Sequence, residues 1–456
     1  MPAVVTDSTS AKKGGPRYQQ LRRGVRGAGG LTRAEVVANQ RARLYEATIE
    51  VTAAGGYEAM TIKAVCALAG VSRRTFYDLF GAGRPTPKQA CFLAAYDFAV
   101  GRAASRINRA YRAERDPELR LCRAFERFAR VLVDEPQTAR VALVEVLGAG
   151  PASLARMRRT RAVFERMIGA SLAEGPAGAA LPPPLLEGIV CGIERITRRL
   201  LLTGGGELTG ASDLAALSDE LLAWVLSYRA PAAATLTGAA RSPARTPAPA
   251  ARSQPRTRIE NDRARILCRA ARIAAARGYA QLSPARIARD AEVSEQRFAE
   301  LFESTEQCFL DALDRLGLEA LVCVARAARS SEDPLVGVHR GIVALMRHIA
   351  DDPVLVRVAF VEVFALGPRG VQRRERLLGQ FTELLAKSLP AGARGDLELE
   401  ASVGAIWGIV HQQVTRGAAK RLPELADYAG YLALAPAIGG EAAVEVIRSA
   451  RRLTED

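Results

Sequence analysis

An internal repeat constrains the fold of this 456-residue chain more than any other feature of its sequence. Residues 41–80 align with residues 263–302 without a gap and share 13 identical positions. Further along, DEPQTARVALVEVLGAGP (134–151) aligns with DDPVLVRVAFVEVFALGP (351–368), with ten identities in eighteen. Two matching blocks in the same order indicate a tandem duplication of a unit of about 190 residues, joined by residues 229–259.

The repeated unit has the pattern of helices. In LLEGIVCGIERITRRLLL (185–202), apolar residues recur at spacings of three and four, which is typical of an amphipathic helix. The pairs Gly150-Pro151 and Gly367-Pro368 follow apolar runs, where a glycine and a proline would end a helix. No segment of the sequence alternates polar and apolar residues between hairpin turns. The sequence therefore predicts an all-α fold.

The first copy of the repeat has the spacing of a helix-turn-helix motif. A helix over residues 36–54 is expected to end at Gly55-Gly56. Thr61 stands where an N-cap belongs, ahead of a short helix, and Ser72 stands in the same position ahead of the next one. Two short helices joined by a tight turn can place the second helix in the major groove of DNA.

The stretch VSRRTFYDLF (71–80) resembles the signature of the TetR family of transcriptional regulators, a pattern like V-S-x-x-T-[LF]-Y-x-x-F. Lys88 precedes QACFLAAYD (89–97), where that family has a lysine-led fourth helix. The resemblance implies that each half holds a helix-turn-helix DNA-binding domain followed by a helical core for effector binding and dimerisation. It further implies a transcriptional regulator, usually a repressor that a small molecule releases from near-palindromic DNA.

The resemblance also implies roles for individual residues of the first copy. Arg73, Arg74 and Thr75 would lie near base edges, at the exposed start of the second short helix. Tyr77 and Lys88 would contact phosphate, and Thr61 would lie at the DNA backbone. A half-buried aromatic ring is the alternative role for Tyr77, and a solvated loop lysine is the alternative for Lys88.

The second copy departs from this pattern at the positions that would contact DNA. Ser283, followed by a proline, replaces the first N-cap, and the recognition positions become Glu295, Gln296 and Arg297. Two explanations stay open. The second motif reads a different half-site, or it has lost DNA contact and remains as scaffold. We favour the first, because residues 229–259 supply six arginines where an arm of the second motif would begin.

Fusion of two diverged copies predicts a single-chain pseudo-dimer on a non-palindromic operator, with motif centres about one helical turn, roughly 34 Å, apart. Helices over 185–202 and 213–230 would pack on helices over 401–417 and 422–435 as a four-helix bundle. Two alternatives remain. Chains could dimerise with only the first motif on DNA, or the protein could be an architectural DNA binder without sequence preference.

Four residues of the cores are candidates for effector binding. Glu145 and Glu362 occupy equivalent positions in apolar helical stretches, where a carboxylate needs a partner. An ion pair and a ligand contact are both open, and the partner is expected on another helix, because Arg140 and Arg357 lie five residues back. Trp407 and His411, one turn apart, could line a pocket; a packed Trp beside a hydrogen-bonded His is the alternative.

Charge and composition set the domain boundaries. Of the net charge of +15, residues 1–35 carry +5 and residues 229–259 carry +6, in segments without helical period. Basic arms on near-neutral folded parts favour a polyanion partner. The expected order is a basic arm (1–35), the first helix-turn-helix (36–82), the first core (83–228), a basic linker (229–260), the second helix-turn-helix (261–303) and the second core (304–456).

Other functions find no support in the sequence. There is no phosphate-binding glycine loop, no nucleophile elbow and no C-x-x-C pair among the seven cysteines, so we expect no enzyme activity, cofactor or metal. No apolar run is long enough to cross a membrane, and nothing resembles an export signal. The expected partners are double-stranded DNA and a small-molecule effector, and the pseudo-dimer could associate further with copies of itself. The expected location is the cytoplasm, at the nucleoid.

Overall fold

The computed structural model describes residues 32–83, 85–174, 178, 180–202, 211–229, 231–236, 258–390 and 395–455. Within these ranges the chain consists of helices and loops and contains no strand, so the prediction of an all-α fold is confirmed. The chain divides into two compact units, Met1–Gly101 and Arg102–Asp456. The predicted basic arm and most of the predicted linker, residues 1–31 and 237–257, lie outside the described residues.

The first unit contains α1 (Arg33–Ala59), α2 (Ile62–Ala69), α3 (Arg73–Phe80) and the start of α4 (Pro87–Arg112). Thr32 and Glu35 form a capping box at the start of α1. The helix predicted over 36–54 thus begins earlier, and it also continues to Ala59. It passes Gly56 at a φ of 83°, which glycine adopts without strain and which kinks the helix there.

Buried aromatic and aliphatic side chains hold α1, α2 and α3 together. Phe76 and Phe80 of α3 lie with ring centroids 5.1 Å apart and pack into the core of this unit. Arg43 of α1 is buried, and its guanidinium donates to the carbonyls of Ala69 and Gly70, the latter at 3.1 Å. These bonds satisfy carbonyls at the end of α2, which fixes the turn before α3.

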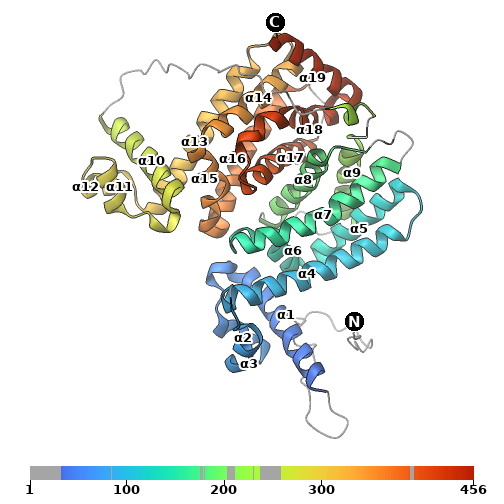
Figure 1. Cartoon of the computed structure of the whole chain (residues 1–456), viewed down its shortest axis with the longest axis vertical. Helices are drawn as coiled ribbons and strands as arrows, with labels where there is room; N and C mark the ends of the chain where they lie inside the picture. The colour runs from blue at the N-terminus through green and yellow to red at the C-terminus, as the bar shows by residue number, and fades with distance from the viewer. Residues whose placement is uncertain are drawn as a thin grey trace. The chain divides into compact units, whose positions relative to one another are not determined.

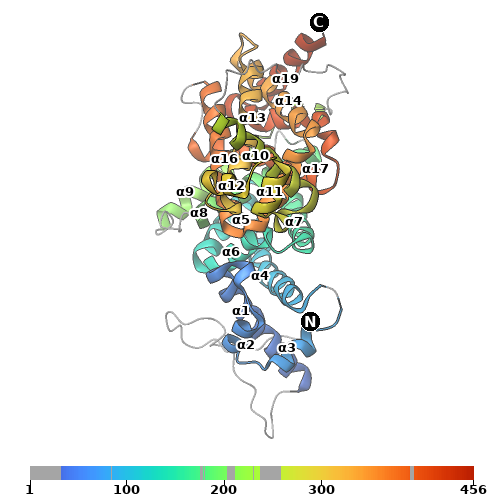
Figure 2. The ribbon, with the colours of Figure 1, turned by 90° about the vertical axis from the view of Figure 1, so that its left-hand side faces the viewer.

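The second unit continues through two further series of helices. The first series comprises α5 (Pro117–Asp134), α6 (Pro136–Leu143), the 3-10 turn η2 (Glu145–Leu147), α7 (Pro151–Glu174), α8 (Pro183–Leu202), α9 (Ala211–Leu226) and η3 (Pro231–Thr235). The second comprises α10 (Arg258–Arg277), η4 (Tyr279–Gln281), α11 (Pro284–Asp290), α12 (Glu295–Leu301), α13 (Thr305–Ala328), α14 (Pro334–Asp351), α15 (Pro353–Phe360), η5 (Glu362–Leu366), α16 (Gly367–Ser388), α17 (Asp396–Thr415), η6 (Ala419–Leu425), α18 (Ala426–Ile438) and α19 (Gly440–Glu455). Figures 1 and 2 both show α10, α11 and α12 grouped together beside α13.

The most extensive helix pairing within the second unit is that of α8 with α17, which lie side by side in Figure 1. Glycines permit this approach. A Cβ atom at Gly192 of α8 would lie 2.6 Å from the carbonyl oxygen of Ala401, and one at Gly408 of α17 would overlap the side chain of Cys191. Neither glycine could gain a side chain without pushing the helices apart.

Polar contacts extend the seam, which is the interface between α8 and α17, to α9 and α18. The indole of Trp224 donates to Ser402 Oγ at 3.2 Å. The Tyr228 hydroxyl donates to the carbonyl of Leu432 at 3.0 Å, and the Tyr431 hydroxyl donates to the carbonyl of Tyr228 at 3.1 Å. All three aromatic side chains are fully buried. The four helices predicted to form a bundle therefore contact one another in the second unit.

A buried polar group joins α14, α18 and α19. Asp427 of α18 is 1% exposed and accepts from His339 Nε2 at 2.8 Å and from the guanidinium of Arg451. Burial lowers the pKa of His339 to about 4, and it lowers the pKa of His411 of α17 well below its ordinary value. Both imidazoles are therefore neutral in the folded protein at pH 7.

These neutral histidines predict a loss of stability in mild acid. In the unfolded chain a histidine has a pKa of about 6.5, so the unfolded state takes up protons first as the pH falls. We expect His339 alone to lower the free energy of unfolding by about 2 kcal/mol between pH 7 and pH 5. Urea unfolding followed by circular dichroism measures this; His339→Gln should show a shallower pH dependence, and an unchanged one would contradict the assignment.

Candidate nucleic-acid interface and effector cavities

The start of α3 presents two arginines to solvent. Ser72 Oγ accepts from the backbone N–H of Thr75 at 3.1 Å, which caps the helix as predicted. The Thr75 hydroxyl lies 2.9 Å from the same Ser72 oxygen, so this side chain faces the cap. Arg73 and Arg74 follow the cap and are exposed. Their place at the helix N-terminus is that from which side chains contact base edges in a major groove.

The other predicted residues of the first motif have different surroundings. Thr61 Oγ1 accepts from the backbone N–H of Ala64 at 3.1 Å, so it caps α2 as predicted. The Tyr77 ring packs edge-on against Phe76 yet is 43% exposed, which leaves it open to solvent. Lys63 of α2 is also exposed and adds a cation to the surface of the first motif.

Lys88 is engaged with α1 in the described conformation. Its ammonium group donates to the carbonyl of Glu58 at 3.0 Å and lies 4.7 Å from the centre of the Tyr57 ring. These contacts satisfy a carbonyl at the end of α1 and add a cation–π interaction. A phosphate contact by Lys88 would have to compete with both and stays a prediction.

The second motif keeps its capping and its core. Ser283 accepts from the backbone N–H of Arg286 at 3.3 Å, and Ser294 accepts from that of Arg297 at 3.1 Å, so both short helices are capped. Phe298 and Phe302 are buried. The helix-turn-helix geometry is therefore preserved although the surface residues differ.

The surface of α12 is acidic. Glu295 and Gln296 are exposed, whereas Arg297 donates to Asp262 at 3.1 Å and to Glu300 at 2.8 Å. Between positions 292 and 303 four glutamates stand against one arginine, a net charge of −3. The equivalent positions 70–81 hold two arginines and one aspartate, a net charge of +1. The phosphate backbone of DNA attracts the surface of the first motif, residues 70–81, and repels that of the second, residues 292–303.

Glu292 is in a backbone conformation suited to glycine. Its φ is 56°, and it is the one non-glycine residue with a positive φ among the described residues. Its counterpart Gly70 has a φ of 60°. A side chain in this left-handed region costs about 1–2 kcal/mol, offset in part by the greater freedom of glycine in the unfolded chain.

Replacing Glu292 with glycine is therefore expected to raise the free energy of unfolding by about 0.5–1 kcal/mol. The reverse change in the first motif, Gly70→Glu, should lower it by about 1 kcal/mol. Chemical denaturation followed by circular dichroism measures both variants. A destabilised Glu292→Gly variant would show that contacts of this carboxylate outweigh the backbone strain.

The two candidate carboxylates of the cores form ion pairs. Glu145 lies 3.2 Å from Arg140 Nε, and Glu362 lies 2.9 Å from Arg357. The prediction that the ion-pair partner would come from another helix is wrong. The preceding helix ends before each glutamate, and a 3-10 turn brings the carboxylate back toward the arginine. Glu362 also accepts from the backbone N–H of Tyr279 at 2.8 Å, which ties the core to the second helix-turn-helix.

An apolar cavity lies between α13, α14, α16 and α17 in the second core. It encloses about 520 Å³ including its opening, and a single serine interrupts its aliphatic and aromatic lining. The lining residues are Val324, Ala328, Val338, Gly341, Ile342, Leu345, Phe381, Leu384, Leu385, Ser388, Val403, Ile406 and Trp407. Trp407 is held there by stacking on Phe360 at 4.9 Å. Such a cavity suits an apolar molecule or the apolar part of one.

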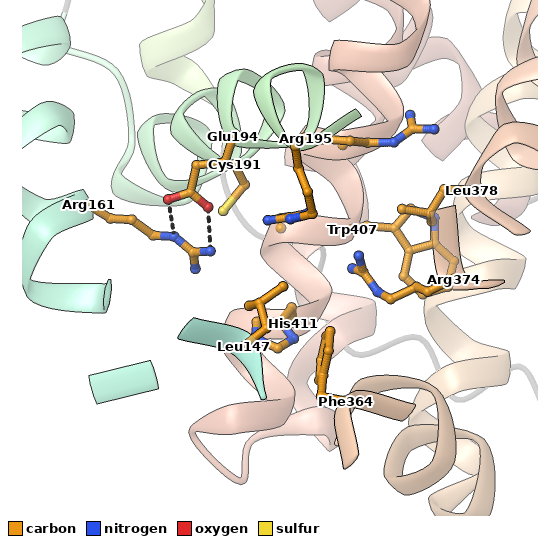
Figure 3. Close-up of a pocket in the computed structure, with 13 residues that line it drawn as sticks. Leu147, Arg161, Cys191, Glu194, Arg195, Phe364, Arg374, Leu378, Trp407 and His411 are labelled. Atoms are coloured by element: carbon orange, nitrogen blue, oxygen red, sulfur yellow. Dashed lines mark hydrogen bonds and ion pairs between the residues drawn. The ribbon is translucent and has the colours of Figure 1, made fainter. Parts of the chain in front are cut away.

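A second cavity, of about 410 Å³ including its opening, lies at the seam between α8 and α17 and is strongly cationic (Figure 3). Its lining comprises Leu147, Arg161, Cys191, Glu194, Arg195, Arg198, Phe364, Arg374, Leu378, Gly404, Trp407, Gly408 and His411. The predicted pair Trp407 and His411 therefore lines a cavity. Glu145 and Glu362 line neither of these two cavities.

None of the helices in the described ranges is both long enough and apolar enough to cross a membrane. Among the same residues, no group of three or more His, Cys, Asp or Glu side chains is arranged to hold a metal ion.

Known proteins match this chain in one segment and in part of its fold. The fold is similar to the transcriptional regulator FadR from Bacillus subtilis in complex with stearoyl-CoA (17% identity, TM-score 0.36, 41% of this chain and 97% of that one). It is also similar to a TetR-like transcriptional regulator from Rhodococcus sp. RHA1 (18%, 0.34, 42% and 96%) and to the fatty acid degradation regulator FadR from Bacillus halodurans (16%, 0.36, 41% and 94%). No curated protein matches the chain.

The family assignment comes from the first helix-turn-helix. The sequence model of the tetR family of bacterial regulatory proteins matches residues 44–83, which span most of α1 and all of α2 and α3. This segment contains the capped turn and the exposed arginines described above. Residues 44–83 therefore form a helix-turn-helix of the type found in the TetR family, and the chain resembles the DNA-binding transcriptional regulators of that family.

Proposed function

We propose that this regulator acts as a single-chain pseudo-dimer and that α3 supplies most of its contacts to the operator. The main support is the difference in surface charge between the two motifs. Arg73 and Arg74 are exposed at the start of α3, whereas the corresponding face of α12 is acidic and its arginine is paired twice. The operator is then asymmetric, because the two motifs of one chain present different surfaces to DNA.

The packing of α8 on α17 supports the pseudo-dimer. Gly188 and Gly192 of α8 approach α17, and Gly404 and Gly408 of α17 approach α8. The two pairs share the spacing of three intervening residues, as expected if the two halves pair like the subunits of a dimer. The domain order 36–82, 83–228, 261–303 and 304–456 belongs to this proposal. So do phosphate contacts from the basic segments 1–35 and 229–260.

The apolar cavity of the second core is the proposed effector site, and release from DNA is the proposed response. Trp407 lines the cavity and stacks on Phe360, the last residue of α15. Two residues later, Glu362 accepts from the backbone of Tyr279 in the second helix-turn-helix. A ligand that displaces Trp407 would move this short chain of contacts and with it the second motif, and would so disturb the smaller share of the operator contacts that this motif supplies.

Selection of bound duplexes from a random DNA library by the full-length chain tests the proposal. We expect one enriched half-motif that disappears in an Arg73→Ala, Arg74→Ala variant. Two unlike half-motifs at fixed spacing would mean that Glu295, Gln296 and Arg297 also read DNA. A palindrome of one motif would mean that two chains pair, against the single-chain pseudo-dimer. An unenriched pool would indicate an architectural binder and overturn the proposal.

A further inference from the structure

The seam cavity carries more positive charge than its acidic side chains neutralise. Four arginines line it, Arg161 and three others from α8 and α16, and each is at most 9% exposed. Arg161 forms a bidentate pair with Glu194 at 2.8 and 2.5 Å. The other three, Arg195, Arg198 and Arg374, share the single carboxylate of Glu375, at 3.2 to 3.3 Å.

Four buried arginines therefore face two buried glutamates, an excess of two positive charges. Two more carboxylates and two more cations lie nearby. Glu400 pairs with Arg199 at 2.7 Å and also attracts Arg195, whereas Glu165 attracts Arg161 and Arg158 adds a cation near His411, so the excess is the same with these groups included. Although burial opposes it, the surrounding guanidinium groups hold the pKa of Glu375 below its usual value. Burial lowers the pKa of Arg374 to about 10. Uncompensated buried charge is costly, and a bound anion removes that cost.

One polar atom in the described lining of the cavity has no hydrogen-bond partner. His411 is 8% exposed and lines the cavity, and its Nδ1 has no hydrogen-bond partner among the described residues. The Arg374 guanidinium donates to Glu375, and its Cζ lies 5.7 Å from the centre of the Phe364 ring. Figure 3 shows Arg195, Arg374 and His411 around the same space, with the Arg161–Glu194 pair at one side.

The two halves contribute different residues to this cavity, because their sequences have diverged around it. Aligning Gly192 with Gly408 places Arg195 opposite His411 and Cys191 opposite Trp407. Arginines from α7 and α8 of the first half thus meet Arg374 and His411 of the second. Two identical subunits would place the same residue on both sides of such a seam, so this charge arrangement depends on the fused chain.

We propose that the seam cavity binds a small dianion, a phosphate monoester or a dicarboxylate. Arg195, Arg198 and Arg374 contact its oxygens, and His411 completes the set of donors. Guanidinium groups can donate two parallel hydrogen bonds to a pair of oxygens on a phosphate or a carboxylate, and two negative charges balance the excess. The bound anion joins α8 of the first half to α16 and α17 of the second. This inference does not depend on which motif contacts DNA.

Calorimetric titration of the full-length chain with inorganic phosphate, succinate and, as a control, chloride at matched ionic strength tests the site. We expect saturable binding of phosphate or succinate and none of chloride. Binding of phosphate alone would assign the site to phosphate esters, binding of succinate alone to dicarboxylates, and both to dianions in general. Tryptophan fluorescence should change with the same midpoint, because Trp407 lines the cavity and the chain has two tryptophans.

Arg374→Met is expected to weaken anion binding at least tenfold while the chain stays folded, because it removes one of the excess buried charges. Arg373→Met is the matched control. Its guanidinium pairs with Asp314 and Asp311 and does not line the cavity, so affinity should not change. His411→Leu is a second variant, expected to weaken binding without removing a charge. Absence of saturable binding, or equal affinity in all three variants and the parent chain, would overturn the proposal.

Discussion

Replacing Arg73 and Arg74 together with alanine is expected to weaken binding to the selected operator by about 30- to 25,000-fold. A guanidinium that donates twice to a base contributes about 1–3 kcal/mol of discrimination, and two such contacts add when they are independent. Both side chains are exposed beyond the Ser72 cap, and α3 is held by buried Phe76, so the change should leave the fold intact. Fluorescence anisotropy at a fixed salt concentration measures the affinity.

Two further variants separate base reading from general attraction. Lys63→Ala should weaken binding to all sequences alike and reduce its salt dependence, as expected for a phosphate contact. Alanine at both Glu295 and Gln296 should change the affinity less than threefold, because the acidic face of α12 is not expected to hold DNA. A loss as large as that from the α3 variant would show instead that the second motif reads its own half-site.

Local features of the fold followed from the sequence. The N-caps at Thr61, Ser72 and Ser283 were predicted correctly, because a capping hydroxyl bonds to a backbone N–H two or three residues away. Phe76 and Phe298, which occupy equivalent positions in the two motifs, are both buried. Helix ends were less accurate. The helix expected to begin at residue 36 begins at Arg33, whereas the break expected at Gly55-Gly56 occurs at Gly56, where φ and ψ are not helical.

Features that depend on packing between distant segments could not be predicted. The seam cavity gathers Arg161, Arg195 and Arg374 from α7, α8 and α16, and no spacing in the sequence relates these residues. The pairing of Glu145 with Arg140 escaped prediction for another reason. An unbroken helix would separate them, but the 3-10 turn after α6 does not. The bond from Lys88 to Glu58 likewise depends on how α4 meets the end of α1.

Replacing Asp427 with alanine is expected to lower the free energy of unfolding by about 3–5 kcal/mol, the cost of removing one partner from a buried ion pair. His339 and Arg451 both donate to this carboxylate, and Arg451 would keep its charge without it. Urea unfolding measures the loss. Glu445→Ala is the control. This residue lies on the exposed face of α19 and pairs with Arg448 and Arg452, and its loss should cost less than 0.5 kcal/mol.

A double variant, Asp427→Ala with Arg451→Met, distinguishes the two sources of this loss. If the uncompensated guanidinium causes most of it, removing that charge should restore at least half of the lost stability. If the loss comes from the cavity and from the unpaired His339, the double variant should be no more stable than Asp427→Ala. The first outcome is expected, because alanine removes few apolar contacts. The charge that remains is that of Arg451, whose side chain is 35% exposed and keeps part of its solvation, so the restoration is expected to be partial.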